Sequence, residues 1–456
     1  MSEQERVSAD VAIVGAGLAG LAAARAVAAA GKRPVVLEAR ERVGGRTLNE
    51  SIGGGDVLEI GGQWVGPTQK RVLALISELG LRTFPTYGEG RNRFERSGRI
   101  RDYSGAIPKV SPLALAETGA SLSRINRMAR TIDPERPWAA PRAESWDSQT
   151  FASWIRRNVR TRTARDLMRL AIWAVWAAEP EDISLLHVLF YVRSAGSFEA
   201  LIDTEGGAQE SRVVGGSQMI SLRMAEELGD AVVLGAPVHR IEHARGVVTV
   251  TSTSGVSVEA WQAIVAMPPV LAGRITYDPP MPAIRDGLTQ RMAMGSVVKC
   301  MAIYPEPFWR DEGLSGQVTS ADGPVSVTYD NSPRDGSPGV LLAFLEGAAA
   351  RRAADLPEDE RREIVVGCLE RFFGPRAAEP ERYIDRAWAA DPYSAGCYGG
   401  FMPPGAWRAN GPALRAPVGP VHWAGAETAT VWNGYMDGAI SSGERAAREA
   451  LEAMGA

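Results

Sequence analysis

The chain has 456 residues, of which 45% are hydrophobic, so it is long enough for two domains with a sizeable core. Its 50 basic and 54 acidic residues give a formal net charge of −4, and no Lys/Arg-rich run stands out, which excludes an electrostatic footprint for nucleic acid or an anionic membrane. The longest strongly apolar run, residues 185–192, is too short for a bilayer span, which needs about 20 residues. We therefore expect a small-molecule partner.

The cysteines and histidines indicate neither a disulfide framework nor a metal site. Cys300, Cys368 and Cys397 are odd in number and widely spaced, which fits a reducing compartment. The four histidines have no cysteine nearby in the sequence, so we expect no metal. No secretory signal is evident before Asp10. These features predict a cytoplasmic protein.

The N-terminal elements predict a βαβ unit. An apolar run at residues 11–14 is typical of a buried strand, an Ala-rich helix follows at 18–30 and stops at Gly31, and a second strand is expected at 34–37. Further along, residues 112–201 are largely helical in character. Strand-like alternation is found at 232–250, 264–267, 325–329 and 340–344, and the last helix is expected at 438–454. The fold class is therefore α/β.

Between the first strand and helix lies a glycine fingerprint, Gly15-x-Gly17-x-x-Gly20. Gly15 permits the tight turn, Gly17 lets the backbone approach a pyrophosphate, and Gly20 lets the helix pack on the strand. The helix N-terminus offers unpaired N–H groups to phosphates. Glu38 ends the second strand, where an acid can accept both ribose hydroxyls. The pattern predicts a bound dinucleotide without separating NAD from FAD.

The turn that follows Glu38 favours FAD. It contains Arg40, Arg42, two glycines at 44 and 45, and Arg46. The ribityl and pyrophosphate of a flavin extend beyond the first glycine loop, so a second turn with backbone donors and an arginine suits FAD better than NAD.

Residues 38–47 and the GGQWVGPTQ segment at 61–69 resemble the flavin amine oxidases, specifically the monoamine oxidase family. The resemblance returns around Lys299, around Cys397 and at 423–439, so it covers nearly the whole chain. It implies a Rossmann-type FAD-binding domain interleaved with a substrate-binding domain of mixed sheet and helices. The FAD-binding domain would comprise residues 1–79, 209–290 and 387–456, and the substrate-binding domain residues 80–208 and 291–386.

The resemblance also implies roles for single residues. Cys397 is similar to the cysteine that forms a thioether to the flavin 8α carbon in animal monoamine oxidases, so we expect covalent FAD. Tyr398 and Tyr435 match the pair that forms an aromatic cage for the amine. Lys299, in an apolar strand where an unpaired ammonium is costly, resembles the lysine that reaches flavin N5 through a water; the alternative is a strand-edge lysine that extends to solvent. Glu427 would bind the ribityl or adjoining groups.

The remaining site predictions form two sets. The predicted cofactor-binding residues are Gly15, Gly17, Gly20, Glu38, Ala39, Arg40, Gly45, Arg46, Thr47, Gly62, Gln63, Trp64, Val238, Trp388, Cys397, Tyr398, Gly425, Glu427, Tyr435 and Met436. The candidates for the substrate cavity, for which an ordinary place in the core is an equal alternative, are Trp173, Trp176, Leu201, Ile202, Gln209 and Tyr329.

The implied activity is oxidation of a primary monoamine to an imine, which water converts to aldehyde and ammonia, while O2 becomes hydrogen peroxide. A putrescine-type diamine oxidase stays open, because Glu179, Asp203 and Asp330 fall in the substrate segments and could hold a second ammonium. An L-amino-acid oxidase is less favoured, since no arginine can be assigned to a substrate carboxylate. A non-catalytic flavoprotein scaffold and an NAD-dependent dehydrogenase are alternatives of other classes. The resemblance makes a homodimer plausible.

Overall fold

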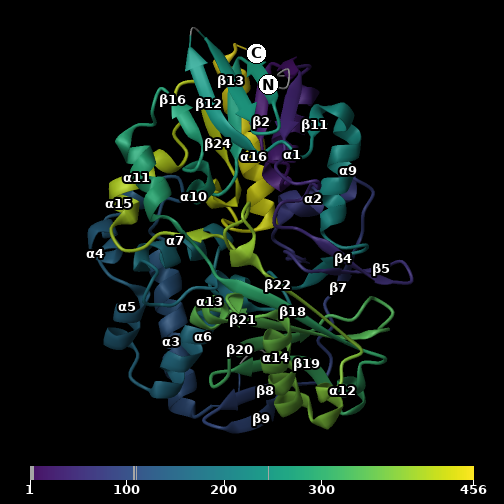
Figure 1. The fold of residues 1–456 in the computed structure, drawn as a ribbon. Helices are drawn as coiled ribbons and strands as arrows, with labels where there is room; N and C mark the ends of the chain where they lie inside the picture. The colour runs from purple at the N-terminus through teal and green to yellow at the C-terminus, as the bar shows by residue number, and fades with distance from the viewer. Residues whose placement is uncertain (1–4, 106–107, 109, 245, 456) are drawn as a thin grey trace.

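The computed structural model describes residues 5–105, 108, 110–244 and 246–455. A five-stranded sheet in the order β11–β3–β2–β15–β24, in which all neighbouring strands are parallel, lies in the half of the molecule that carries both ends of the chain (Figure 1). It collects strands from three separate parts of the sequence. These are β2 (Val11–Val14), β3 (Pro34–Leu37), β11 (Val232–Val233), β15 (Gln262–Ala266) and β24 (Val421–Ala424).

The expected βαβ unit is confirmed, with α1 (Leu18–Ala29) between β2 and β3. The predicted last helix is also present as α16 (Met436–Ala453), and it packs closely against α1. Small residues allow this approach, because a Cβ at Gly443 of α16 would lie 2.0 Å from the carbonyl oxygen of Ala19. The first and last helices of the chain therefore share one interface beside the sheet.

A second five-stranded sheet, β1–β14–β13–β12–β16, packs against the first through a shared apolar core. The alternating residues 232–250 divide among β11, β12 and β13 rather than forming one strand. The strands of this second sheet are β1 (Glu5–Ser8), β12 (Val238–Ala244), β13 (Val247–Ser252), β14 (Val256–Ala260) and β16 (Thr276–Asp278).

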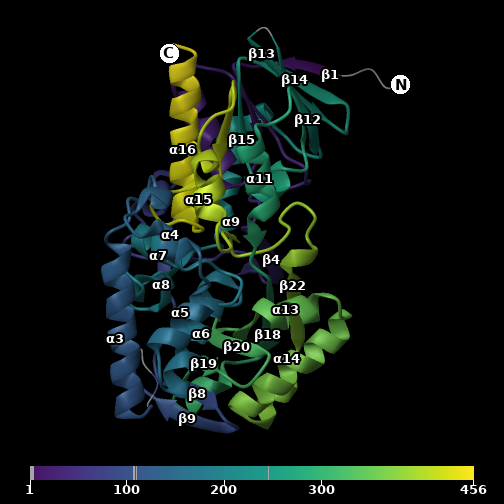
Figure 2. The same ribbon diagram turned by 90° about the vertical axis from the view of Figure 1, so that its left-hand side faces the viewer.

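The other half of the molecule is built on a seven-stranded mixed sheet in the order β22–β18–β21–β20–β19–β8–β9. Two distant parts of the chain form it, as interleaved domains would require, although the predicted domain boundaries stay predictions. Apolar residues of α14 (Glu358–Phe373) cover one face, and Figure 2 shows this helix on the opposite side from α3. The strands are β8 (Arg91–Arg96), β9 (Arg99–Tyr103), β18 (Val297–Tyr304), β19 (Leu314–Ser320), β20 (Val325–Asp330), β21 (Gly339–Glu346) and β22 (Arg382–Ala387).

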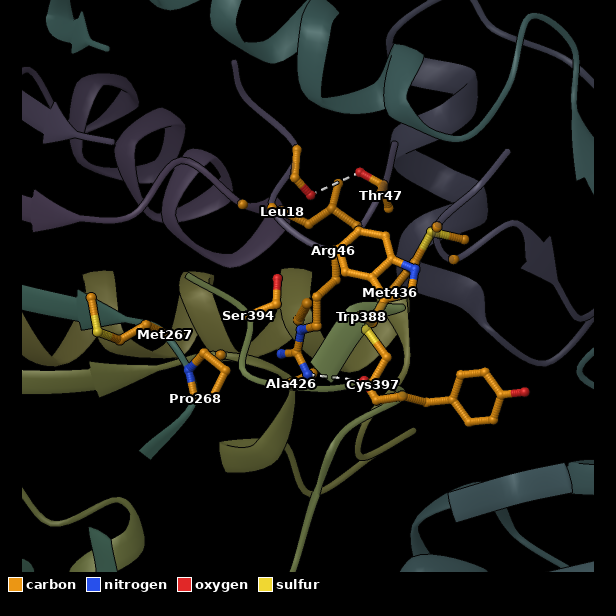
Figure 3. A pocket seen from close by; sticks show the side chains of 18 of the residues that line it. Leu18, Arg46, Thr47, Met267, Pro268, Trp388, Ser394, Cys397, Ala426 and Met436 are labelled. Atoms are coloured by element: carbon orange, nitrogen blue, oxygen red, sulfur yellow. Dashed lines mark hydrogen bonds between the residues drawn. The ribbon is translucent and has the colours of Figure 1, made fainter. Parts of the chain in front are cut away.

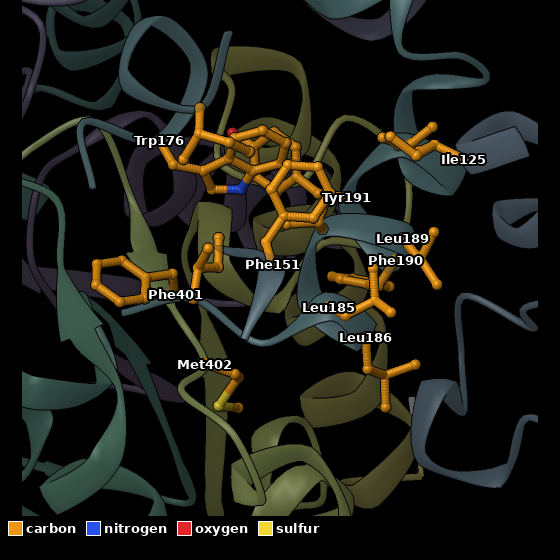
Figure 4. Close-up of a cluster of buried hydrophobic side chains, with 14 of the residues drawn as sticks. Ile125, Phe151, Trp176, Leu185, Leu186, Leu189, Phe190, Tyr191, Phe401 and Met402 are labelled. Atoms are coloured by element: carbon orange, nitrogen blue, oxygen red, sulfur yellow. The ribbon is translucent and has the colours of Figure 1, made fainter. Parts of the chain in front are cut away.

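Residues 112–202 form the predicted helical region. The apolar run at 185–192 lies inside α7, every one of its side chains is buried, and it packs among the other helices in the core that Figure 4 shows. In the described part of the chain, no helix has both the length and the apolar character that a bilayer crossing requires. The helices are α3 (Pro112–Ala129), α4 (Ala143–Asp147), α5 (Phe151–Asn158), α6 (Arg162–Trp176), α7 (Leu185–Ala195) and α8 (Glu199–Ile202).

Candidate active site

A cavity of about 460 Å³ connects the glycine turn after β2 with Tyr398 and Tyr435. It lies where the carboxyl ends of the parallel strands meet the seven-stranded sheet, which is the place where open α/β sheets bind ligands. The predicted residues that line it are Gly15, Gly17, Glu38, Ala39, Arg40, Gly45, Arg46, Thr47, Gly62, Gln63, Trp64, Gln209, Val238, Lys299, Tyr329, Trp388, Cys397, Tyr398, Gly425, Tyr435 and Met436.

The glycine turn is fixed by backbone contacts. Gly15 has φ +99° and its N–H donates to Leu37 O at 2.8 Å. A Cβ at Gly20 would lie 1.9 Å from Gly15 O, so this glycine serves the packing of α1 on the turn and does not itself line the cavity. Helix α1 begins after Gly17 with no side-chain cap and no acid in its first turn. Its first N–H groups are therefore free to meet an anion in the cavity.

Glu38 is held in place at the end of β3. It is 3% exposed, its Oε2 accepts a hydrogen bond from Ala16 N at 2.7 Å, and its Oε1 accepts one from Arg40 N at 3.0 Å. An anchored carboxylate beside a dinucleotide turn can accept ribose hydroxyls without further ordering.

Arg46 links the N-terminal turn to the C-terminal part of the site. Its guanidinium forms two parallel hydrogen bonds to Glu427, at 2.6 and 3.0 Å, and donates to Tyr398 O at 3.0 Å. Glu427 Oε1 also accepts from Gly400 N, and the carboxylate does not line the cavity. In this structure Glu427 fixes the position of Arg46, which favours an indirect role, and its predicted contact with the ribityl or adjoining groups stays a prediction.

Lys299 lies in the middle of the fully buried strand β18 and is 4% exposed, so the alternative of a lysine that extends to solvent is wrong. Its Nζ donates to Glu59 O at 2.5 Å, to Gly61 O at 2.8 Å, and to the Gln63 side chain. Burial lowers the pKa of Lys299 to about 7, against the opposing effect of Glu59. The end of the cavity that Tyr398 and Tyr435 line, called the amine end below, thus has a lysine that changes charge near neutral pH.

Cys397 is a free, buried cysteine at the cavity wall, and Figure 3 draws it in the same part of the pocket as Trp388 and Arg46. Burial raises the pKa of its thiol to about 12, while the Arg46 guanidinium acts in the opposite direction. Trp388 is anchored by a hydrogen bond from its Nε1 to Ile60 O at 3.0 Å.

The two predicted cage tyrosines have different supports. Tyr435 immediately precedes α16 and its ring packs edge-on against Trp432, with centroids 4.9 Å apart. The ring of Tyr398 packs edge-on against Phe344, with ring centroids 6.0 Å apart, and the Tyr398 hydroxyl donates to Glu346 Oε1 at 2.9 Å. Both rings line the one cavity, as an aromatic cage requires.

Four candidates for the substrate cavity do not line it. Trp176 and Leu201 are buried in the helical core, where Trp176 packs on Tyr191 with ring centroids 4.9 Å apart (Figure 4). Ile202 packs on the outside of that core. Trp173 donates from Nε1 to Glu179 at 3.0 Å instead of facing the cavity. For these residues the core interpretation is the correct one.

Other lining residues were not predicted. Among them are five from α6, α7, β20 and β21, which are Ala174, Val175, Tyr191, Val327 and Phe344. No motif marks these positions, because apolar residues in helices and strands have the same composition whether they face a core or a cavity. The alternation of β20 and β21 could have indicated two faces, but not which face was open.

The residues present fit FAD. The free N–H groups at the start of α1 suit a pyrophosphate, Glu38 suits a ribose, and the cavity continues from them to an aromatic region next to Lys299, where a flavin ring would lie. When bound, the flavin supplies the two-electron chemistry, and the protein supplies binding, orientation and electrostatics.

Comparison with known proteins gives the family. The profile described as "Flavin containing amine oxidoreductase" matches residues 18–451. The chain belongs to this family. It is therefore an enzyme, a flavin-containing amine oxidoreductase acting on CH–NH2 groups, and the scaffold and NAD-dehydrogenase alternatives are set aside.

Relatives with different named substrates are similarly close. A Mycobacterium tuberculosis protein named flavin-containing monoamine oxidase AofH is 42% identical over 96% of each chain. A Synechocystis protein named L-amino acid dehydrogenase is 39% identical, over 97% of this chain and 94% of its own. The solved structure of wild-type putrescine oxidase bound to putrescine is 37% identical, covers 98% of this chain and all of its own, and superposes with a TM-score of 0.94.

Proposed function

We propose that the chain is an FAD-dependent oxidase of primary monoamines with an aromatic or aliphatic tail, which converts the amine to an imine and O2 to hydrogen peroxide. One observation carries this proposal: a single cavity joins the dinucleotide cradle to Lys299 and to two tyrosine rings. Tyr398 and Tyr435 would align the amine between their rings, and the apolar wall would exclude water. Lys299 would hold or release a proton beside the flavin ring during reoxidation.

The charges of the cavity wall support a monoamine over a diamine. Glu38, next to the glycine turn, is the only carboxylate among its described lining residues, so none faces the aromatic end. The acids that were candidates for binding a second ammonium either accept hydrogen bonds from other residues or do not line the cavity. Glu179 accepts from Trp173 and Arg169, Asp330 accepts from Trp309 and Arg310, and Asp203 is not a lining residue.

The arginines likewise support an amine without a carboxylate. Those that line the cavity are Arg40, Arg46 and Arg274. Arg40 pairs with Asp391 at 2.5 Å, Arg46 pairs with Glu427, and Arg274 donates to Pro392 O. An amino acid would want a free guanidinium near the tyrosines.

We further propose that FAD is bonded to Cys397 through a thioether at the 8α carbon. The position of the thiol at the cavity wall, beside Trp388 and Arg46, supports this. Acid precipitation tests it: the yellow colour should stay with the pellet of the wild-type protein and move to the supernatant for Cys397→Ala. Yellow colour in the wild-type supernatant would contradict it. The predictions of a cytoplasmic location and a homodimer rest on the sequence alone.

The substrate proposal is tested by mixing the oxidised holoenzyme anaerobically with benzylamine, phenylethylamine, tyramine, tryptamine, putrescine and an L-amino acid. We expect bleaching of the flavin absorbance and, in air, peroxide with the monoamines. Faster bleaching with putrescine would replace the monoamine assignment with the diamine alternative.

A further inference from the structure

Glu346, the last residue of β21, is a buried acid at the hydroxyl end of Tyr398. It is 3% exposed, and it does not line the cavity, whereas Tyr398 does. The Tyr398 hydroxyl donates to Oε1 at 2.9 Å, and the Ser326 hydroxyl donates to Oε2. Tyr398 therefore stands between a carboxylate and the space in which an amine would be held.

No cation among the described residues pairs with this carboxylate, although Glu346 directly precedes α13 (Gly347–Ala354), whose N-terminal dipole favours the ionised form. Opposite Glu346, β18 presents Val297, and β20 contributes Ser326 and Tyr329. From the loop after α6, Glu179 accepts a hydrogen bond from Ala348 N, two residues beyond Glu346, and pairs with Arg169.

Lys299 lies near the same face of β21, with its Nζ 5.9 Å from the ring centroid of Phe344. It gives its hydrogen bonds to the 59–63 segment instead. Within the described part of the chain, Glu346 has no ion-pair partner.

A buried acid without a cation is costly in its ionised form. Burial raises the pKa of Glu346 to about 7, although the hydrogen bonds from Ser326 and Tyr398 oppose the rise. The residue thus changes charge near neutral pH, next to a ring on which the proposed function depends.

We propose that Glu346 is a positioning residue for amine oxidation: it fixes the Tyr398 hydroxyl and, when ionised, places a negative charge behind the Tyr398 ring, one ring away from the amine that becomes positive. This inference rests on the proposed function. Transfer of a hydride, one proton with two electrons, from the α carbon of the neutral amine to the flavin would leave an iminium cation. A carboxylate separated from it by one ring stabilises that cation more than the uncharged amine, and a protonated acid does not.

The test is the pH dependence of flavin reduction by benzylamine, measured anaerobically as the second-order rate constant. Only the neutral amine reacts, so the logarithm of the rate constant rises with slope one below the amine pKa. Below about pH 7 Glu346 becomes protonated as well, so the rate constant of the wild type should break away from this line and fall roughly tenfold below it, before the slope returns to one at still lower pH. Glu346→Gln should keep slope one throughout and react roughly tenfold more slowly at pH 9, because the charge is lost.

Two further variants sharpen the result. Ser326→Ala removes a hydrogen bond that favours the ionised form, so the break in slope should move to higher pH. Glu179→Gln changes a neighbouring acid that does not touch Tyr398, and it should leave the break in place. Lys299→Met should also keep the break, which separates the two groups that titrate near pH 7.

A break that persists in Glu346→Gln would overturn the inference. If that variant fails to fold or to hold flavin, Ser326→Ala decides, and an unmoved break would overturn it equally. Failure of the proposed function gives a different result, because then no amine would reduce the wild-type flavin at any pH.

Discussion

The two ends of the cavity are built in different ways. At the glycine end, one stretch of sequence, residues 15–47, supplies a turn that backbone hydrogen bonds hold in shape, and residues from 237–275 and 392–394 complete the wall beside it. At the amine end, single side chains converge from β18, β20, β21, α7 and the segment after β22. The contrast teaches that a ligand held by backbone leaves a spacing pattern in the sequence, whereas a ligand held by converging side chains does not.

The largest expected effect is at the glycine end. Gly20→Ala puts a Cβ 1.9 Å from Gly15 O, where no flexible side chain can give way, so we expect loss of bound FAD and destabilisation by about 3 kcal/mol or more. Flavin absorbance per chain and urea unfolding measure it. The matched control is Gly119→Ala in α3, where the new Cβ meets open space, and it should keep both flavin and stability. Full flavin content in Gly20→Ala would contradict the view that the glycine end depends on close backbone packing.

A loss of stability of comparable size is expected where the two ends are joined. Arg46→Met leaves Glu427, whose side chain is fully buried, without its cation, and such a break costs about 3–5 kcal/mol. The double variant Arg46→Met/Glu427→Leu removes both charges and should unfold less readily than the single variant. Thermal unfolding of both proteins tests this, and equal stability of the two would show that the pair is not the cause.

Lys299 connects stability with pH. Its folded pKa of about 7 lies below the ordinary value near 10.4, so between these values the unfolded chain binds a proton that the folded chain has released. Stability should therefore rise with pH across this window, by at most about 5 kcal/mol.

Lys299→Met removes this contribution. The difference in unfolding free energy between wild type and variant, measured in urea at pH 7 and pH 9.5, should shift in favour of the wild type at the higher pH. A constant difference would mean that Lys299 is not desolvated. The variant should also reoxidise more slowly with oxygen.

The smallest expected effects compare a substitution at the cavity wall, Tyr329→Phe, with one at a residue off the wall, Trp173→Phe. Tyr329→Phe removes a hydroxyl from the wall and should change the KM for amines by about two- to fivefold, the value of one hydrogen bond. Trp173→Phe loses the bond to Glu179 and should cost about 1 kcal/mol of stability, with KM unchanged. A change in KM for Trp173→Phe would place that residue back among the substrate contacts.

Much of the fold was predictable because, as at the glycine end, local patterns in the sequence mark the elements. The βαβ unit and the last helix follow from local periodicity and from Gly31 as a stop signal, and the structure has them within two residues of the predicted limits. Sheet order was not predictable, because β11, β15 and β24 join β2 and β3 from far along the chain. The residue pattern of a strand does not indicate which other strands pair with it in the sheet.

At the site, residues inside strong motifs lie at the cavity wall, and those chosen by composition mostly do not. Gln209 and Tyr329 line it, but Trp173 and Trp176 do not, since a tryptophan on a helix fits a core as well as a cavity. Glu427 was predicted from its motif as a cofactor ligand, yet an acid next to a buried arginine binds the arginine first. Glu346 was missed because its meaning depends on Tyr398, 52 positions away.

The pairing of Arg46 with Glu427 has a consequence for how the enzyme is made. The turn that would hold the cofactor lies 381 positions before the carboxylate that fixes Arg46 in place. The strand β24 and the helix α16, which complete the same half of the molecule, flank that carboxylate in the sequence. We therefore expect the cofactor to bind only after synthesis of the chain has passed Glu427, because a shorter chain has the glycine motif without the completed site.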